Sequence, residues 1–115
     1  MSNIHFYRCD SCGIIEHPLP QLKELVPNTV DASGEKHLPV VKVEGDKLIA
    51  RIGSVDHPMV PEHFIQWVFV ETDKGSHRLD LQPGQEPQAV FSVPGEKPVA
   101  VYEYCNLHGL WKTEV

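Results

Sequence analysis

Residues 63–70 read HFIQWVFV and are the most strand-like stretch of the chain. Aromatic and β-branched side chains dominate them, which is typical of a strand that is buried on one or both faces. Three further short strands are predicted at residues 77–81, 89–93 and 99–104, and turn sequences that contain glycine or proline separate them. Short strands joined by tight turns in this way predict an antiparallel β-sandwich.

A β-hairpin is predicted earlier in the chain, over residues 41–52. Apolar and polar side chains alternate on both sides of Gly45-Asp46, which supplies the turn. The predicted fold class is therefore all-β. Large aromatic residues dominate protein cores, so three aromatic side chains of the predicted strands are expected in the core: Trp67, Phe69 and Phe91.

Residues 1–34 differ from the rest of the chain and are predicted to be a short irregular N-terminal segment. They contain Cys9-x-x-Cys12 and a stretch that prolines interrupt. Only residues 21–26 have the composition of a short helical turn. Apolar residues in the segment do not recur at a spacing that would give a helix or strand one buried face. We therefore expect two parts, the N-terminal segment over residues 1–34 and a β-sandwich domain over residues 35–115.

Length and charge narrow the classes of function. The chain has 115 residues, which suits one full-sized core. Its 16 acidic and 10 basic residues give a formal charge of -6, which argues against a nucleic-acid partner because phosphate binding needs a basic face. No stretch approaches the roughly 20 apolar residues that span a bilayer, so no membrane association is expected.

The cysteine count and the first residues predict a cytoplasmic protein. Three cysteines cannot all pair within one chain, and small secreted domains usually carry larger, even numbers. The first residues also lack the apolar stretch and cleavage site of a secretory signal. Both observations favour a reducing compartment, most simply the cytoplasm.

Seven histidines and three cysteines in so short a chain point to a metal site. Five of these residues fall in four segments at predicted junctions of strands and loops, where a rigid scaffold can aim side chains at one point. The segments are EKHLP (35–39), HPM (57–59), EH (62–63) and CNLHG (105–109). Four imidazoles and one thiolate exceed the four ligands of a structural zinc site, and they suit an iron with one open position.

The set EKHLP, HPM, EH and CNLHGLW resembles the superoxide reductase family (desulfoferrodoxin and neelaredoxin), in the family's order and over residues 28–112. In that family the catalytic iron is bound by four equatorial histidines and one axial cysteine thiolate. The resemblance implies an immunoglobulin-like β-sandwich with one mononuclear non-haem iron per chain. It assigns the equatorial ligands to His37, His57, His63 and His108 and the axial ligand to Cys105.

The resemblance also implies the reaction, which is the one-electron reduction of superoxide, with two protons, to hydrogen peroxide. Superoxide would bind opposite Cys105, and the thiolate would push electron density toward it. The family's glutamate, which can close that position on ferric iron, maps to Glu35. Its lysine maps to Lys36, whose charge would attract the anion. A rubredoxin-like electron donor and a homo-oligomer, either a dimer or a tetramer, are also implied.

Cys9 and Cys12 mark where the chain departs from the two-iron members of that family. Those members carry a small desulforedoxin-like domain with a Cys-x-x-Cys and a later Cys-Cys pair. The second pair is missing here, so one chain cannot complete a four-cysteine iron site. The remaining pair is interpreted as a vestige, a redox-labile dithiol or half of a metal site shared between subunits.

Two other functions fit parts of the sequence. Cys9-x-x-Cys12 with Cys105-x-x-His108 spells the ligands of a structural zinc module for binding partners, but the gap of about 90 residues is far longer than in zinc ribbons. An iron electron carrier without catalysis is the other alternative, although it would not need an open coordination position. Three further histidines are expected to be ordinary solvated side chains: His5, His17 and His77.

Overall fold

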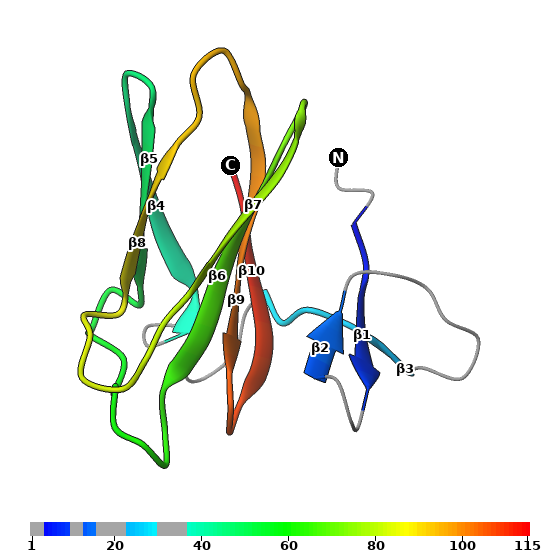
Figure 1. Ribbon diagram of the computed structural model, residues 1–115, viewed down its shortest axis with the longest axis vertical. Coiled ribbons are helices and arrows are strands. Elements are labelled where there is room, and N and C mark those ends of the chain that lie inside the picture. Colours follow the sequence, from blue (N-terminus) through cyan, green and yellow to red (C-terminus); the bar gives the residue numbers. More distant parts are fainter. Residues whose placement is uncertain (1–3, 10–12, 16–22, 30–36) are drawn as a thin grey trace.

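The computed structural model describes residues 4–9, 13–15, 23–29 and 37–115. Within these residues the chain forms ten β-strands in three sheets, and neighbouring strands in each sheet are antiparallel (Figure 1). None of the described segments is a helix with the length and apolar character needed to cross a membrane. The strands are β1 Phe6–Cys9, β2 Gly13–Ile15, β3 Lys23–Leu25, β4 Pro39–Glu44, β5 Lys47–Ile52, β6 Ile65–Thr72, β7 Gly75–Asp80, β8 Gln88–Ser92, β9 Pro98–Cys105 and β10 Gly109–Glu114.

Two of the sheets form the layers of a sandwich (Figure 1). One layer has the strand order β10-β9-β6-β7, and the other has the order β4-β5-β8. Their facing sides share one apolar core, with fully buried side chains that include Leu48, Ile52, Val68, Val70 and Val101. The all-β antiparallel sandwich that the sequence predicts is confirmed.

β4 and β5 form the hairpin that the alternating pattern predicts. Glu44 pairs with Lys47 across the turn, and Gly45 has a φ of +60°, in the left-handed region that favours glycine. Every second residue of β5 is buried, as the two-residue period of a strand with one face on the core requires.

β6 is the central strand, and both of its faces are buried. Val68 faces the core between the layers, whereas Trp67 and Phe69 face outward into a second apolar cluster. The pairing of β6 with β9 shifts between Ile65 and Trp67, so Ile65 joins the same core as Val68. Such an irregularity changes the direction of side chains locally, and it lies at the start of β6, which begins two residues after His63.

The third sheet, β2-β1-β3, covers the outward face of the four-stranded sheet. Phe6 of β1 is only 2% exposed. Its ring centroid lies 5.3 Å from that of Trp67, 5.2 Å from that of Phe69 and 4.8 Å from that of Tyr102. The N-terminal strands therefore complete a second core on the outside of the sandwich.

These N-terminal strands replace the irregular segment that the sequence predicts. Residues 23–25 form β3, within the stretch where the composition suggested a helical turn. Leu25 pairs with Phe6 and packs against the same aromatic cluster. The apolar surface that stabilises this small sheet comes from the four-stranded sheet, so the periodicity of the segment itself carries no sign of it.

Asn28 attaches the end of the described N-terminal part to β10. Its N–H donates to the carbonyl of Leu110 at 2.9 Å, and its carbonyl accepts from the N–H of Lys112 at 2.9 Å. Residues 30–36 lie outside the described part of the chain. The division predicted between residues 34 and 35 therefore stays a prediction.

Replacing Phe6 with alanine should weaken the packing of the N-terminal sheet on the sandwich. We expect the free energy of unfolding to fall by about 3 kcal/mol, because the variant removes a buried aromatic ring. Denaturant titration with tryptophan fluorescence measures the change, since Phe6 contacts Trp67. Val26→Ala is the control because Val26 is 85% exposed; equal unfolding midpoints for the two variants would contradict this packing.

Candidate metal centre

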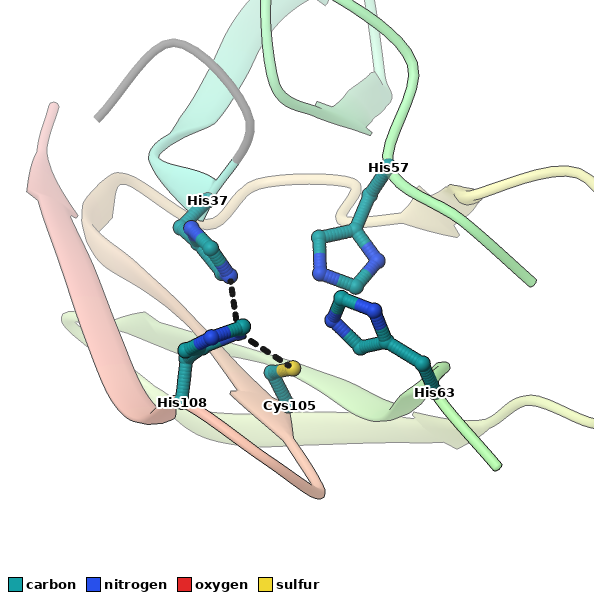
Figure 2. Close-up of side chains that lie close together, drawn as sticks. All are labelled: His37, His57, His63, Cys105 and His108. Atoms are coloured by element: carbon teal, nitrogen blue, oxygen red, sulfur yellow. Dashed lines mark hydrogen bonds between the residues drawn. The ribbon is translucent and has the colours of Figure 1, made fainter. Parts of the chain in front are cut away.

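Five side chains from separate parts of the chain converge at one end of the sandwich (Figure 2). The nitrogen that each imidazole offers and the sulfur of the cysteine all lie within 4.8 Å of one another. The five residues are His37 before β4, His57 after β5, His63 before β6, Cys105 at the end of β9 and His108 in the turn between β9 and β10.

Strand pairing explains how these segments meet. Pro39 pairs with Ile52, which places the start of β4 beside the end of β5 and so brings His37 near His57. Ile65 pairs with Cys105 in the other layer, which places the start of β6 beside the end of β9. The cluster therefore bridges the two layers of the sandwich, with two histidines from one layer and the remaining three residues from the other.

The four imidazoles form a closed ring of neighbours. Ring centroids lie 4.8 Å apart for His37 and His57, 4.7 Å for His57 and His63, 5.0 Å for His63 and His108, and 4.8 Å for His37 and His108. Figure 2 shows the rings turned toward one another, with the side chain of Cys105 reaching the group from β9. The sulfur of Cys105 lies 3.7 Å from Nδ1 of His108.

Burial differs across the cluster. Cys105 is fully buried, and His37 and His57 are each 3% exposed. His63 is half-buried, and His108 is exposed. Solvent and small solutes therefore reach the cluster from the side of His108, while the sulfur lies on the interior side.

His57 is held in the neutral form that binds metals. Burial lowers the pKa of His57 from 6.5 to about 4, and the neighbouring imidazoles lower it further, against a hydrogen bond to the carbonyl of Pro58 that raises it. That carbonyl can only accept, so Nδ1 of His57 carries the proton and donates to it at 2.7 Å. Nε2 is then a buried acceptor with no hydrogen-bond partner among the described residues. Such an atom is expected to have a ligand.

Cys105 is a buried thiol with two backbone N–H groups beside it. Burial raises the pKa of Cys105, and the N–H groups of His108 and Leu107 oppose that shift. A bound cation deprotonates a coordinating thiol outright. Four nitrogen donors and one sulfur donor fit a transition metal that accepts both, and the fifth donor exceeds the tetrahedral set of a structural zinc site.

A model of the desulfoferrodoxin family matches residues 29–114. The chain belongs to this family. Desulfoferrodoxin from Syntrophotalea carbinolica is 41% identical over 123 residues, which cover 96% of each chain. A superoxide reductase from Pyrococcus horikoshii is 37% identical over 112 residues, which cover 82% of this chain and 96% of that protein.

Solved structures of superoxide reductases share the fold of this desulfoferrodoxin-family chain. The crystal structure of the enzyme from Treponema pallidum has a TM-score of 0.84 and 33% identity, and the match covers 98% of this chain and 100% of that one. The one-iron superoxide reductase from Giardia intestinalis has a TM-score of 0.60 and 33% identity, with 70% of this chain and 97% of that one covered. The Treponema structure therefore shares nearly the whole chain, whereas the Giardia structure leaves out almost a third of it.

Trp111 supports two of the five residues, and it is the last residue of the CNLHGLW motif, in which no role was predicted for it. Its ring stacks on that of His37 with a centroid distance of 4.6 Å and an angle of 15°. Its Nε1–H donates to the carbonyl of His108 at 3.1 Å. Trp111 is 2% exposed, so its packing fixes both the His37 ring and the His108 backbone.

Arg51 and Asp56 brace the turn that leads to His57. Nε and one terminal nitrogen of Arg51 donate to the two carboxylate oxygens of Asp56 at 2.9 and 2.8 Å. The Arg51 guanidinium holds the pKa of Asp56 below its usual value. A bidentate pair of this kind restricts the geometry of the turn in addition to pairing two opposite charges.

Glu103 is a buried carboxyl group near the cluster, and no sequence motif indicates a role for it. It is fully buried two residues before Cys105, and its carboxyl oxygens have no hydrogen-bond partner among the described residues. Burial raises the pKa of Glu103 well above its usual value, which favours the neutral acid.

Several predicted site residues lie outside the described part of the chain: Glu35, Lys36 and Cys12. Cys9 ends β1, and nothing is described of its side chain. The structure groups Cys105 and His108 with the three histidines that a zinc module built on Cys9-x-x-Cys12 would leave unexplained.

Two of the remaining histidines contact carboxylates away from the cluster. His5 Nδ1 lies 2.6 Å from Glu24, and His77 Nε2 lies 2.9 Å from Glu96. Neither belongs to the group of five. His17 lies outside the described residues.

The low pKa of His57 predicts that acid destabilises the metal-free protein. The imidazole has a pKa of 6.5 when unfolded and about 4 when folded, so between these values the unfolded chain binds a proton that the folded chain does not. The contribution of His57 should be constant above pH 6.5, and it should decrease the free energy of unfolding by on the order of 3 kcal/mol as the pH falls to about 4. Denaturant titrations of wild type and His57→Gln should give a shallower pH slope for the variant; identical slopes would contradict the assignment.

Proposed function

We propose that this chain is a superoxide reductase, which reduces superoxide by one electron to hydrogen peroxide at a mononuclear non-haem iron. The iron is held by His37, His57, His63, His108 and Cys105. The observation that carries the proposal is the convergence of these five donor atoms within 4.8 Å in a member of the desulfoferrodoxin family. Superoxide reductases among its relatives and structural neighbours support the choice of reaction.

The donor set favours iron over the alternatives. Imidazole suits iron, zinc and copper, and a thiolate raises electron density on iron. When bound, iron supplies the transferred electron and a position where the superoxide anion can bind. Five protein donors would leave iron an open position for that anion, whereas a structural zinc site with four protein ligands is closed.

The protein residues prepare the site in three ways. His57 keeps a neutral imidazole because burial holds the pKa of this residue at about 4, so no proton has to leave it before a metal binds. Burial of Cys105 keeps the sulfur away from solvent and so from oxidants in solution. The exposed side near His108 admits a small anion and gives water access to deliver the two protons.

Glu35 and Lys36 take their proposed roles from the family resemblance. Lys36 attracts superoxide, because its charge locally offsets a net charge of -6. Glu35 would occupy the open position of the site when the iron is oxidised. Cys9 and Cys12 are a vestige of a second iron site, since the chain lacks the other cysteine pair. A rubredoxin-like donor, a cytoplasmic location and assembly as a homo-oligomer complete the proposal.

Cys105→Ser should abolish both superoxide reduction and the thiolate-to-iron absorption of the oxidised protein. A serine hydroxyl does not replace the thiolate as a ligand that raises electron density on iron. The sandwich should remain folded, because the hydroxyl is close in size to the thiol. Wild type should contain about one iron per chain. Metal analysis, absorption spectra in both redox states and stopped-flow kinetics with superoxide measure these quantities.

Cys9→Ser is the matched control and should keep the iron content, the absorption band and the rate of wild type. Zinc in place of iron, with no redox-dependent colour in the wild-type protein, would contradict the proposed function. So would an unchanged rate in Cys105→Ser.

Lys36→Ala should slow the encounter with superoxide by about 10-fold at low ionic strength and flatten its dependence on salt. Lys74→Ala makes the same change in net charge on the exposed turn between β6 and β7, at the opposite end of β6 from His63. Pulse radiolysis over a series of salt concentrations measures both rates. Equal rates for the two variants at low salt would contradict the proposal that the charge of Lys36 attracts superoxide to the site.

A further inference from the structure

Asn106 lies between Cys105 and His108 and contacts the loop that carries His63. Its side-chain Nδ2 donates to the carbonyl of Glu62 at 3.0 Å. Its Oδ1 accepts from the N–H of Phe64 at 3.0 Å. The amide therefore binds the backbone on both sides of His63.

The backbone of Asn106 adds a third bond to the same loop, because its N–H donates to the carbonyl of Phe64 at 3.3 Å. The loop is itself closed by two bonds between Val60 and His63, each 3.0 Å long. A closed loop that is tied to the next element at both flanks of one residue leaves that residue little freedom to move. Asn106 thus adds side-chain bonds between two ligand-bearing segments, residues 60–63 and 105–108, beyond the strand pairing of Ile65 with Cys105.

We propose that Asn106 is a positioning residue that sets the location of His63 relative to Cys105 and His108. This inference rests on the proposed metal function. A primary amide is suited to the task because it offers a donor and an acceptor in one plane, and here each meets its backbone partner. Alanine offers neither group, and aspartate keeps only the acceptor.

A purely structural role for Asn106 predicts a different result from a positioning role. If the bonds only stabilise two loops, their loss lowers the stability of the metal-free protein and leaves metal binding unchanged. If they position His63, their loss also weakens metal binding, because a ligand that must be ordered at the moment of binding costs free energy. Substitution of residues that orient metal ligands without binding the metal typically lowers metal affinity by about 10- to 100-fold.

Asp73 provides a matched control at the other end of the sandwich, in the turn between β6 and β7 (Figure 1). Its Oδ1 accepts from the N–H of Lys97 at 2.7 Å, and its own N–H donates to the carbonyl of Lys97 at 3.0 Å. Asp73 therefore ties one loop to another through a side-chain acceptor and a backbone donor, as Asn106 does, but without the side-chain donor of Asn106. None of the five clustered residues takes part in those bonds.

The test is titration of the metal-free full-length chain with Co²⁺ alone, for wild type, Asn106→Ala and Asp73→Ala. Cobalt absorption bands report both affinity and ligand geometry, and thermal unfolding of the metal-free proteins reports stability. Both variants should lose thermal stability. Asn106→Ala alone should bind Co²⁺ at least about 10-fold more weakly, with shifted ligand-field bands. Cobalt affinity and bands in Asn106→Ala that equal those of Asp73→Ala would overturn the inference.

Asn106→Asp is the second test variant, to be used if the alanine variant does not fold. It has the same shape and keeps the bond from the N–H of Phe64, and it should show the band shift in the same direction as alanine. Wild-type bands in this folded variant would also overturn the inference.

Cobalt binding involves no superoxide chemistry, which separates this inference from the proposed function. A wild type that binds Co²⁺ and fails to reduce superoxide as the iron form overturns the function alone. A reductase in which Asn106→Ala matches the Asp73→Ala control overturns the positioning role alone.

Discussion

Packing four imidazoles and a thiol into one small space at the end of an apolar core is the constraint on which the rest of the structure depends. Buried polar groups cost free energy unless they have partners, and His57 Nε2 has no hydrogen-bond partner among the described residues. Like-charged imidazolium ions this close would repel one another. A bound cation removes both costs, since it accepts electron pairs from neutral rings and from the thiolate. The metal-free cluster is therefore a preformed but unfavourable arrangement that the sandwich must hold in place.

The sandwich holds it through its strand pairing and through a small number of side chains. The pairings of β4 with β5 and of β6 with β9 bring four strand ends to one place. Trp111, Asn106 and the pair Arg51–Asp56 then fix individual ligands or the turns that carry them. On the outward face of β6, the N-terminal sheet covers the strand through Phe6, whose ring stacks on that of Trp67.

Much of this architecture is predictable from the sequence, because strand periodicity records which face is buried. The hairpin around Gly45 follows from this alternation. The central strand follows from its aromatic and β-branched composition, which predicts it over residues 63–70, and the structure has it at Ile65–Thr72. The N-terminal sheet is not predictable in this way, since its strands have three or four residues and are stabilised by an aromatic surface from elsewhere in the chain. Family resemblance names the five clustered residues, and the structure brings them together. The supporting contacts of Asn106 and Trp111 involve backbone atoms or ring stacking, which leave no spacing signature. The roles of Glu35 and Lys36 stay predictions, because both residues lie outside the described part of the chain.

We propose that one iron ion is bound by these five side chains, and the proposed reaction depends on that ion. X-ray absorption at the iron edge of the purified protein measures the identity and number of the atoms bound to the metal. We expect a single sulfur and four imidazole nitrogens in the first coordination sphere, in agreement with the set of donors that meet within 4.8 Å. A sphere with no sulfur, or one dominated by several sulfurs as in a site built on Cys9 and Cys12, would contradict it.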